Sequence, residues 1–349
     1  MVSHDDTEGL VAAVRAAYAS ADPLEIRGGG TRRHLGRAPS GTALSVGGHS
    51  GLVEYDPSEF VVTVRAGTRV DELAARLAEA GQVLAVDVPR LGAASTIGGA
   101  IATGLSGPSR PYTGALRDIV LGARVISGTG EVLNFGGRVL KNVAGFDVSR
   151  LMVGAYGTLG LILDVTLRLA PRPEVEEVRQ LACAWPQARS ALAAWEAALP
   201  LSGACYERGV LSVRLSGTER RVAKARAVIG GDPGALTVFT HLRDLSGDFF
   251  AQGGDLWRLL VPPDAPWDPV ETVIDWGGAQ RYWMWAGEVS AVYAQAQAAR
   301  GQAMRVWGRD RGASPWATPP PATQALMARV KAALDPRGIL NRGRLYPDW

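Results

Sequence analysis

Three glycine-rich stretches are the parts of this sequence best suited to bind a phosphate group. They occupy residues 28–32, 95–104 and 154–160, and each joins an expected strand to a turn or helix. Glycine permits positive φ and a close approach of the backbone to a ligand, and consecutive N–H groups can surround an anion. Neither the G-x-G-x-x-G nor the G-x-x-x-x-G-K-[ST] pattern is present, which argues against the standard NAD and ATP folds. The sequence therefore predicts a large nucleotide bound by separated loops.

The middle stretch, residues 95–104, lies in a segment with almost no charge or bulk. Between positions 92 and 107 there is no charged side chain and nothing larger than Ile or Leu. Ser95 and Thr96 can cap a helix that begins near Ile97, where a helix N-terminus attracts anions. The stretch also contains three glycines that each cost roughly 1 kcal/mol in helix propensity: Gly98, Gly99 and Gly104. We expect close approach to a pyrophosphate here; a tight contact through small residues is the alternative.

Composition and charge exclude several classes of protein. The chain has 349 residues, of which 47% are hydrophobic and 20% charged, with a formal net charge of +3. The near-balanced, scattered charges give no electrostatic case for nucleic acid. The start of the chain lacks the apolar core of a signal peptide, and the longest uncharged apolar run, 151–163, is too short to span a bilayer. We expect a soluble, cytoplasmic protein with no membrane span.

Metal chemistry is not expected of this chain. Its two cysteines, Cys183 and Cys205, form no C-x-x-C pair and fit buried, inert thiols. An iron–sulfur cluster needs about four thiolates, so this chain cannot hold one by itself. The histidines are not at metal-ligand spacing: His4, His34, His49 and His241.

The elements that must position the loops form two groups. In residues 1–171 we expect helices over 6–19, 68–80 (capped by Thr68) and 149–153, and strands over 24–27, 43–46, 60–65, 83–86, 119–127, 131–135 and 161–169. In residues 172–310 we expect strands over 174–185, 256–261, 280–285 and 302–307, one or two strands over 204–215, and helices over 186–199, 218–229 and 288–300. A last helix is expected over 322–334. This order predicts an α+β fold whose second part is a small antiparallel sheet with helices on one face.

Other side chains have two interpretations each. Arg110 and Arg117, with Asp118, could bind a carboxylate, or Arg117 and Asp118 could form a structural pair at the end of their loop. Four tryptophans could form an electron-transfer wall or pack in a core or interface: Trp276, Trp283, Trp285 and Trp307. The basic helix 218–229 fits a solvated face, with docking to an acidic partner as the alternative.

Four motifs together resemble the FAD-binding domain of the vanillyl-alcohol-oxidase/p-cresol-methylhydroxylase (PCMH-type) flavoprotein family. They are Gly28-Gly29-Gly30-Thr31, the turn at 95–99, the run KNVAGFD at 141–147, and the run GTLG at 157–160. The runs GPSRPYTGALRDIVLG, GGRVLKNVAGFDVSRLMVGAYGTLG and DWGGAQRYW are similar to the E-type FAD-binding subunits of bacterial glycolate oxidases. The end of the chain, 334–344, resembles the segment that folds back onto the flavin domain in this family.

The resemblance implies residues that bind FAD. They are Gly28, Gly29, Gly30, Thr31, Arg32, Ser95, Thr96, Ile97, Gly98, Gly99, Thr103, Gly104, Lys141, Asn142, Gly157, Thr158, Gly160 and Leu161. Residues 28–32 and 95–99 would cradle the pyrophosphate, Thr103 and Gly104 would line the isoalloxazine, and 157–161 the adenine-ribose side. Lys141 and Asn142 would face the flavin or an anionic substrate, although Lys141 also fits a surface charge in a loop.

The resemblance also concerns how FAD is attached. Some members of the family carry, immediately after the glycines, a histidine that bonds covalently to the flavin. Thr31 stands at that position here, so non-covalent FAD is expected. His34, three residues further on, is the alternative attachment point.

One departure from the family affects the expected activity. Its catalytic 2-hydroxyacid dehydrogenases, including the sister D-type subunit, carry an H-G-H-x-G-D-G-N-type cluster, whereas His241 stands alone here. The resemblance then implies one flavoprotein subunit of a complex that oxidises a small 2-hydroxy acid, glycolate, to glyoxylate. Oxidation would occur mainly on the sister FAD-dependent subunit, and electrons would leave through a cysteine-rich iron–sulfur subunit. No catalytic residue is assigned.

Two other functions remain open. The chain could be a stand-alone FAD-dependent dehydrogenase of another hydroxy acid or alcohol, or a non-catalytic assembly subunit that retains the fold. In every case the expected division is a two-subdomain PCMH-type FAD-binding domain over 1–171, an antiparallel-sheet cap over 172–310, and a C-terminal segment, 311–349, that returns to the FAD domain. Partners could hold the complex peripherally at the inner membrane.

Overall fold

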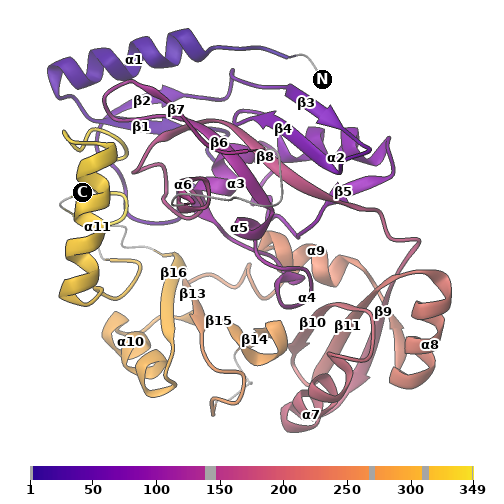
Figure 1. Cartoon of the computed structure of the whole chain (residues 1–349). Helices are drawn as coiled ribbons and strands as arrows, with labels where there is room; N and C mark the ends of the chain where they lie inside the picture. Colours follow the sequence, from indigo (N-terminus) through magenta and orange to yellow (C-terminus); the bar gives the residue numbers. More distant parts are fainter. Residues whose placement is uncertain (1–2, 138–146, 267–271, 309–313, 348) are drawn as a thin grey trace.

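The chain forms two parts that stack on each other, joined again by its C-terminal end (Figure 1). The computed structural model describes residues 3–137, 147–266, 272–308, 314–347 and 349. The N-terminal part, defined here as α1 to β8, is built around a six-stranded sheet, and the C-terminal sheet, defined as β9 to β16, has eight strands in the described ranges. Within these ranges no helix is long and apolar enough to cross a membrane.

The N-terminal part alternates short helices and strands. Its helices are α1 (Thr7–Ser20), α2 (Val70–Ala78), α3 (Ile97–Thr103), α4 (Arg110–Thr113), α5 (Leu116–Ile119) and α6 (Val148–Leu151). Its strands are β1 (Leu24–Arg27), β2 (Thr42–Ser45), β3 (Leu52–Asp56), β4 (Val61–Arg65), β5 (Gln82–Leu84), β6 (Val120–Ile126), β7 (Val132–Gly136) and β8 (Leu161–Pro171). The order in the main sheet is β3-β4-β8-β6-β7, with β5 pairing β8, while β1 and β2 form a parallel pair.

Strand β8 lies at the centre of this part. It pairs with β4 on one side and β6 on the other, so that Val165 lies opposite both Val64 and Ala123. A central strand covered on both faces is buried at consecutive positions, as β8 is from Leu161 to Leu167. Its two polar side chains in this run are bonded to neighbouring strands, Asp164 to Arg124 and Thr166 to Thr63. The core around it also contains Ile339 and Leu340 from the end of the chain.

The C-terminal sheet is antiparallel between every neighbouring pair of strands. Its strands are β9 (Val175–Ala182), β10 (Leu201–Glu207), β11 (Val210–Gly217), β12 (Asp232–Gly234), β13 (Asp255–Leu260), β14 (Thr272–Asp275), β15 (Gln280–Trp285) and β16 (Gln302–Trp307). Its helices are α7 (Trp185–Trp195), α8 (Glu219–Ile229), α9 (Thr237–Asp244) and α10 (Val289–Ala298), with the short 3-10 helix η1 at Trp276–Gly278. Helix α11 (Pro321–Leu334) follows, in the returning end of the chain.

The helices cover both faces of this sheet, so the expectation of helices on one face was wrong. Ala204 and Tyr206 of β10 share a core cluster with α7 and α8. Cys205, between them, belongs to a different cluster with Phe239 of α9, and neighbouring residues of a strand point to opposite faces. Helix α9 lies between the sheet and the N-terminal part (Figure 1), and the sequence analysis did not predict it.

The structure tests the two helix caps expected at Thr68 and Thr96. The helix expected at 68–80 begins at Val70 and is not capped by Thr68, whose buried hydroxyl instead accepts a hydrogen bond from the Gly51 N–H at 2.8 Å. The cap expected at Thr96 is confirmed, because its hydroxyl accepts from the Gly99 N–H at 3.3 Å.

The end of the chain joins the N-terminal part through backbone and side-chain bonds. The Leu24 N–H donates to the carbonyl of Ile339, and Leu24 in turn accepts from Asn341. Buried Lys331 donates to the carbonyl of Thr158 at 2.7 Å and pairs with Asp335 at 2.6 Å. The returning segment is therefore bonded to β1 and to the loop that precedes β8.

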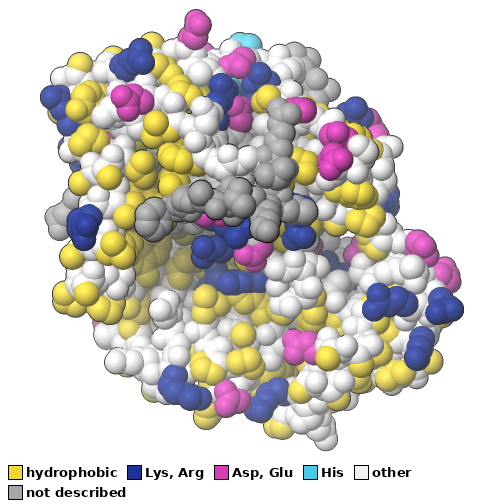
Figure 2. Space-filling model, in the orientation of Figure 1, with side chains coloured by type: hydrophobic (Ala, Val, Ile, Leu, Met, Phe, Trp, Pro, Cys, Tyr) yellow, Lys and Arg dark blue, Asp and Glu magenta, His cyan; other side chains and the backbone are white. Residues whose placement is uncertain are grey.

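The junction between the two parts is hollowed on one face. Figure 2 shows this hollow, with dark blue Lys and Arg side chains gathered in it. Four polar contacts in the described residues cross the junction: Arg214 to Asp87 at 2.8 Å, the Arg90 N–H to Asp244 at 2.9 Å, Trp276 Nε1 to the carbonyl of Gly107 at 3.0 Å, and the Tyr156 hydroxyl to Met304 Sδ at 3.9 Å.

Candidate functional site

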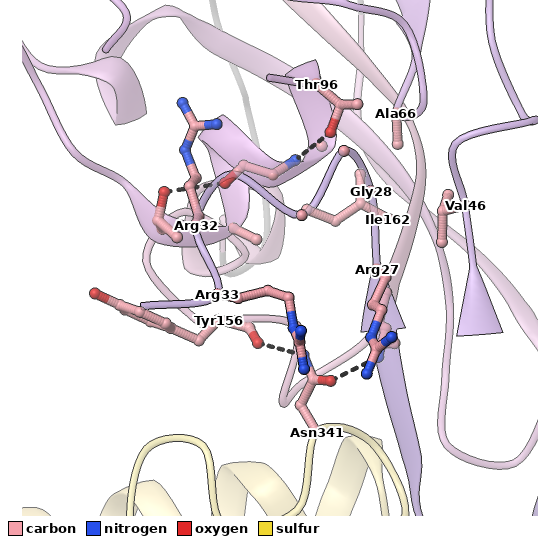
Figure 3. A pocket seen from close by; sticks show the side chains of 18 of the residues that line it. Arg27, Gly28, Arg32, Arg33, Val46, Ala66, Thr96, Tyr156, Ile162 and Asn341 are labelled. Atoms are coloured by element: carbon pink, nitrogen blue, oxygen red, sulfur yellow. Dashed lines mark hydrogen bonds between the residues drawn. The ribbon is translucent and has the colours of Figure 1, made fainter. Parts of the chain in front are cut away.

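A pocket in the N-terminal part gathers residues from six separate segments of the chain (Figure 3). They come from β1 and the loop after it, from the positions directly after β2 and β4, from α3 and its cap, from the loop and strand around 156–162, and from the returning end. The lining residues are Glu25, Ile26, Arg27, Gly28, Gly29, Gly30, Thr31, Arg32, Arg33, Val46, Ala66, Thr96, Gly98, Gly99, Ala102, Thr103, Tyr156, Gly157, Gly160, Ile162, Asn341 and Arg344.

The loop at 28–32 presents its backbone N–H groups without partners. In the part of the chain that the structure describes, no acceptor is found for the N–H groups of these five consecutive residues. Polar backbone groups at a protein surface or pocket normally find a partner in the protein, in water or in a ligand. A run of free N–H groups lining a pocket is a concave anion-binding element.

The N-terminus of α3 is already bonded within the protein, which corrects the expectation for this helix. The Ile97 N–H donates to the carbonyl of Thr68 at 2.9 Å and the Gly98 N–H to the carbonyl of Ala66 at 2.8 Å. The Gly99 N–H donates to its cap, Thr96. These donors are therefore not available to a pyrophosphate, which leaves the loop at 28–32 as the candidate anion-binding element.

The glycines of the pocket serve two different purposes. A Cβ on Gly29 would lie 1.5 Å from the carbonyl oxygen of Ala94, and a Cβ on Gly98 would lie 2.6 Å from the Cβ of Ala66. These two glycines allow segments of the protein to touch, as the small-residue alternative predicted. A Cβ on Gly99 would meet only the Thr96 hydroxyl, at 3.2 Å, and Arg32 at 3.9 Å, so Gly99 faces the pocket.

A buried arginine supplies positive charge behind the loop. The side chain of Arg32 is almost completely buried, and its Nη1 donates to Ser95 Oγ at 2.6 Å and to Thr31 Oγ1 at 3.2 Å, while Nη2 donates to the carbonyl of Pro89. Burial lowers the pKa of Arg32 to about 10, against the opposing attraction of Asp244. The guanidinium is still charged at neutral pH, and it makes no ion pair within the described residues.

The returning end of the chain closes the pocket. Asn341 Oδ1 accepts from the Ile26 N–H at 2.7 Å, and Asn341 Nδ2 donates to the carbonyl of Tyr156 at 2.6 Å. Arg344 donates to the carbonyl of Arg32 at 2.8 Å. Figure 3 shows Asn341 between the loop of Tyr156 and β1. The resemblance predicted the return of this segment, but no periodicity or motif in the sequence marked its individual pocket residues.

The predicted site residues fall into three groups. Those that line the pocket are Gly28, Gly29, Gly30, Thr31, Arg32, Thr96, Gly98, Gly99, Thr103, Gly157 and Gly160. Those that do not line it are Ser95, Ile97, Gly104, Thr158 and Leu161; they are structural neighbours of the pocket, and Ser95 bonds to Arg32. Lys141 and Asn142 lie outside the described residues.

Pocket residues that the sequence analysis missed are mostly side chains without a motif. They are Glu25, Ile26, Arg27, Arg33, Val46, Ala66, Ala102, Tyr156, Ile162, Asn341 and Arg344. Residues 25–27, Arg33, Ala102 and Tyr156 lie within or next to the glycine-rich stretches in the sequence, and this proximity could have indicated that they line the pocket. No such signal existed for Asn341 and Arg344, since more than 300 residues separate them from the loop they contact.

The histidines lie away from the pocket lining. His34, the alternative attachment point, places its ring edge-on against Trp307 of β16 at 6.1 Å between centroids. His241 is exposed at the end of α9. No group of three side chains that could hold a metal ion is found within the ranges that the structure describes.

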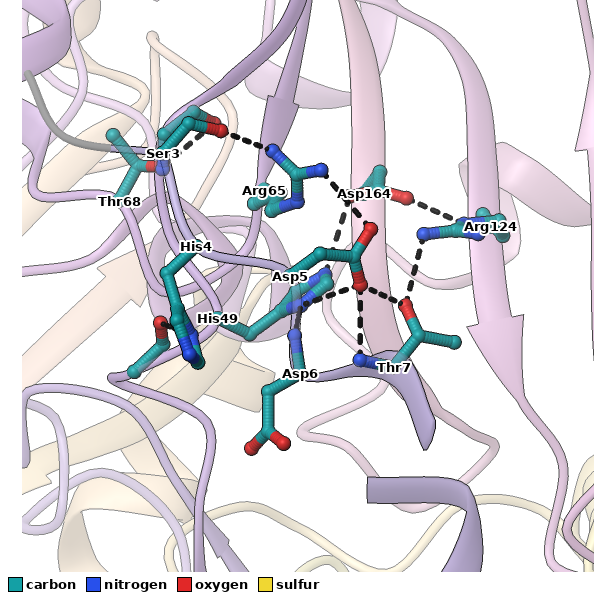
Figure 4. A network of polar contacts seen from close by, with 12 residues as sticks. Ser3, His4, Asp5, Asp6, Thr7, His49, Arg65, Thr68, Arg124 and Asp164 are labelled. Carbon is teal, nitrogen blue, oxygen red and sulfur yellow. Dashed lines mark hydrogen bonds and ion pairs between the residues drawn. The ribbon is translucent and has the colours of Figure 1, made fainter. Parts of the chain in front are cut away.

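A second polar cluster fixes the start of α1 to the main sheet (Figure 4). Completely buried His49 accepts from the Asp6 N–H through Nδ1 at 3.1 Å, and its Nε2 lies 3.3 Å from Asp164 Oδ1. Asp164 also pairs with Arg124, which donates to the Thr7 hydroxyl at 3.1 Å. Because every member is bonded to another, this cluster stabilises the fold and offers no free group for chemistry.

Comparison with known proteins identifies the class to which this chain belongs. The family model described as an FAD binding domain matches residues 1–136. The glycolate oxidase subunit GlcE of Escherichia coli K12 is 40% identical over 99% of this chain and 98% of its own length. The glycolate oxidase subunit GlcD of Bacillus subtilis is 32% identical, but over only 44% of this chain and 33% of its own length. The D-lactate dehydrogenase of Archaeoglobus fulgidus is 30% identical over 55% of this chain and 43% of its own length.

Solved structures with the same fold extend over nearly the whole chain. A structure of alkyldihydroxyacetonephosphate synthase superimposes with a TM-score of 0.68, covers 97% of this chain and 74% of its own, and is 15% identical in sequence. Such low identity supports the fold alone. Fold and family model together define a flavoprotein with a PCMH-type FAD-binding domain. Within that class, the chain belongs to the family of the glycolate oxidase subunit GlcE.

Proposed function

We propose that this chain is the FAD-binding subunit of a glycolate oxidase complex. The observation that supports it most directly is the run of five unpartnered N–H groups at 28–32, which lines a pocket beside the buried cation of Arg32. A pyrophosphate matches this arrangement, because its oxygens accept hydrogen bonds and its charge offsets a buried guanidinium. The relative named as a glycolate oxidase subunit supplies the substrate class.

The pocket residues fit FAD in distinct ways. Residues 28–32 would bind the pyrophosphate, with Arg32 beneath them, and Gly99 and Thr103 would leave room along α3. Tyr156 and Asn341 would hold the rim where the returning segment lies. When bound, FAD supplies the acceptor for the two electrons removed from a 2-hydroxy acid. The attachment would be non-covalent, because Thr31 occupies the position after the glycines and His34 packs against Trp307.

The chain would act within an assembly. We propose a sister FAD-dependent subunit and a cysteine-rich iron–sulfur subunit as partners, and a cytoplasmic location in which any attachment to the inner membrane is made through those partners. The two cysteines of this chain do not replace the iron–sulfur subunit, since burial raises the pKa of both thiols, Cys183 and Cys205. We propose the domain division 1–171, 172–310 and 311–349 for this subunit.

The testing experiment is a visible absorption spectrum of the purified chain, repeated after glycolate is added without oxygen. A flavin spectrum is expected, and acid precipitation is expected to release the flavin into the supernatant. A colourless protein that cannot be reconstituted with FAD would refute the proposal. Flavin that remains in the precipitate would refute non-covalent attachment.

The response to glycolate separates the remaining functions. We expect the flavin of the isolated chain to stay oxidised and that of the co-expressed complex to bleach. Bleaching of the isolated chain would instead identify a stand-alone dehydrogenase. If the complex bleaches equally when this chain carries no FAD, the chain is an assembly subunit.

A further inference from the structure

Trp276 occupies a strained position at the junction of the two parts. It begins η1, directly after β14, with a positive φ of 52°. Bulky residues rarely adopt this conformation, and where they do the surrounding structure must hold them in place. Here the indole is 7% exposed, and its Nε1 donates to the carbonyl of Gly107 in the N-terminal part at 3.0 Å. Burial and this hydrogen bond therefore hold one aromatic ring across the junction.

Two arginines from different parts of the chain lie on this ring. The Cζ atom of Arg110, at the start of α4, is 4.5 Å from the centroid of the Trp276 ring, and the Cζ atom of Arg258, in β13, is 5.4 Å from it. Each contact is a cation–π interaction. Together they bring two guanidinium groups to one indole.

The two cations are only weakly compensated by carboxylates of the described residues: the attraction of Asp118 on Arg110 is smaller than the repulsion by Arg258. Neither Arg110 nor Arg258 forms an ion pair there, and the buried Nε of Arg258 has no hydrogen-bond partner. Other arginines at the same junction are paired: Arg214 with Asp87 at 2.8 Å and Arg243 with Asp244 at 2.6 Å. Burial and, next, repulsion by Arg258 lower the pKa of Arg110. Holding two half-buried like charges together is unfavourable unless an anion joins them.

The position of Arg258 relates this pair to the nucleotide pocket. In the C-terminal sheet Arg258 lies opposite Tyr282 on one side and Met304 on the other, so the three share one face. On that face Met304 Sδ lies 3.9 Å from the hydroxyl of Tyr156, which lines the pocket. Arg258 therefore lies on the face of the C-terminal sheet that contacts the pocket-lining Tyr156.

We propose that Arg110 and Arg258, held by Trp276, form a binding site for the carboxylate of a small 2-hydroxy or 2-oxo acid. This inference rests on the proposed function for the identity of the acid. A carboxylate accepts two hydrogen bonds from an arginine fork and neutralises the charge that remains weakly compensated at the pair. Because Arg110 comes from the N-terminal part and Arg258 from the C-terminal sheet, the bound acid would bridge the junction.

The experiment is a calorimetric titration of the FAD-loaded chain with glycolate and with oxalate, with Trp fluorescence as a second readout. Arg258→Gln and Arg110→Gln are each expected to weaken binding at least about 10-fold, the usual loss of a charge-assisted hydrogen bond. Arg258→Lys is expected to restore part of the affinity, since it keeps the charge without the fork. Arg221→Gln, an exposed arginine of α8, is the matched control and should bind as the native chain does.

The outcomes separate this site from the proposed function. Native-like binding in both glutamine variants, or no binding of either acid to the FAD-loaded native chain, would overturn the site. Equal binding of uncharged glycolamide would overturn it as well, because the site requires a carboxylate. Binding that depends on both arginines in a complex that never oxidises glycolate would leave the site in place and refute the proposed function.

Discussion

Arg32 Nη1 donates to Ser95 Oγ at 2.6 Å, and this bond joins two glycine-rich stretches that are 63 residues apart in the chain. The same guanidinium donates to the carbonyl of Pro89, so it attaches the loop at 28–32 to the segment that leads into α3. One side chain therefore holds the two stretches together and places a positive charge beneath the free N–H groups.

Replacing this arginine should separate cofactor binding from folding. Arg32→Gln is expected to weaken FAD binding at least about 10-fold, because it removes a buried positive charge and charge-assisted bonds. The measurement is a titration of the flavin-free chain with FAD, followed by flavin fluorescence. Arg76→Gln, which removes an exposed partner of Glu79, is the control and should bind FAD normally. Unchanged affinity in Arg32→Gln would rule out its proposed role.

A bulky residue at Gly99 should exclude the nucleotide without disturbing the fold. Gly99 faces the pocket, and a Cβ there meets only the far ends of Thr96 and Arg32. Gly99→Val is therefore expected to be purified without flavin, with a melting temperature within a few degrees of the flavin-free native chain. Gly48→Val is the control, since a Cβ at Gly48 meets nothing within 4 Å and lies outside the pocket. Full flavin content in Gly99→Val would contradict the assignment of this pocket.

Asn341 should contribute to stability through its two long-range bonds. Asn341→Ala leaves the Ile26 N–H and the Tyr156 carbonyl without partners, and unsatisfied buried groups cost roughly 1–3 kcal/mol in free energy of unfolding. Urea denaturation of the flavin-free chain measures this loss. The control, Asn134→Ala on the exposed face of β7, is expected to change stability by less than about 0.5 kcal/mol. Equal stability of the two variants would show that the returning segment is held by other contacts.

Asp275 should make stability depend on pH. Burial raises the pKa of this carboxyl from 3.8 to about 7, although the Trp276 N–H and Gln280 Nε2 donate to it. The native state therefore binds the proton more tightly than the unfolded chain, and this contribution to stability is lost as pH rises from about 4 to about 7.

The direction of this pH dependence can be checked by comparing the native chain with Asp275→Asn. The free energy of unfolding of the native chain is expected to fall relative to that of the variant across this range, by at most about 1.4 kcal/mol per pH unit, and to stay constant above it. Denaturation curves at pH 4, 5, 6, 7 and 8 provide the measurement. A difference that is constant from pH 4 to 7, or that grows in the native chain's favour, would show that Asp275 is ionised throughout.

Local features of the sequence were sufficient for several elements. The strands expected over 280–285 and 302–307 form at those bounds, in short runs rich in aromatic and other apolar residues, and Thr96 caps α3 as its side chain predicts. In each case the information is in residues that are neighbours in the chain, where hydrophobic period and capping chemistry act. Helix α9 was missed because its Thr and Val residues do not favour a helix, which forms where Phe239 and Leu242 pack into the core.

The sequence alone also located the glycine-rich loops and, through their order, the kind of cofactor that they suit. Only the tertiary structure decided which of them has N–H groups to offer: α3 donates to the carbonyls of Thr68 and Ala66, while the loop at 28–32 keeps its donors free. It likewise decided that Asn341 closes the pocket and that Arg110 and Arg258 meet on Trp276. These are contacts between residues from 18 (Arg258 and Trp276) to more than 300 positions apart, and they depend on how the elements pack, which no local propensity specifies.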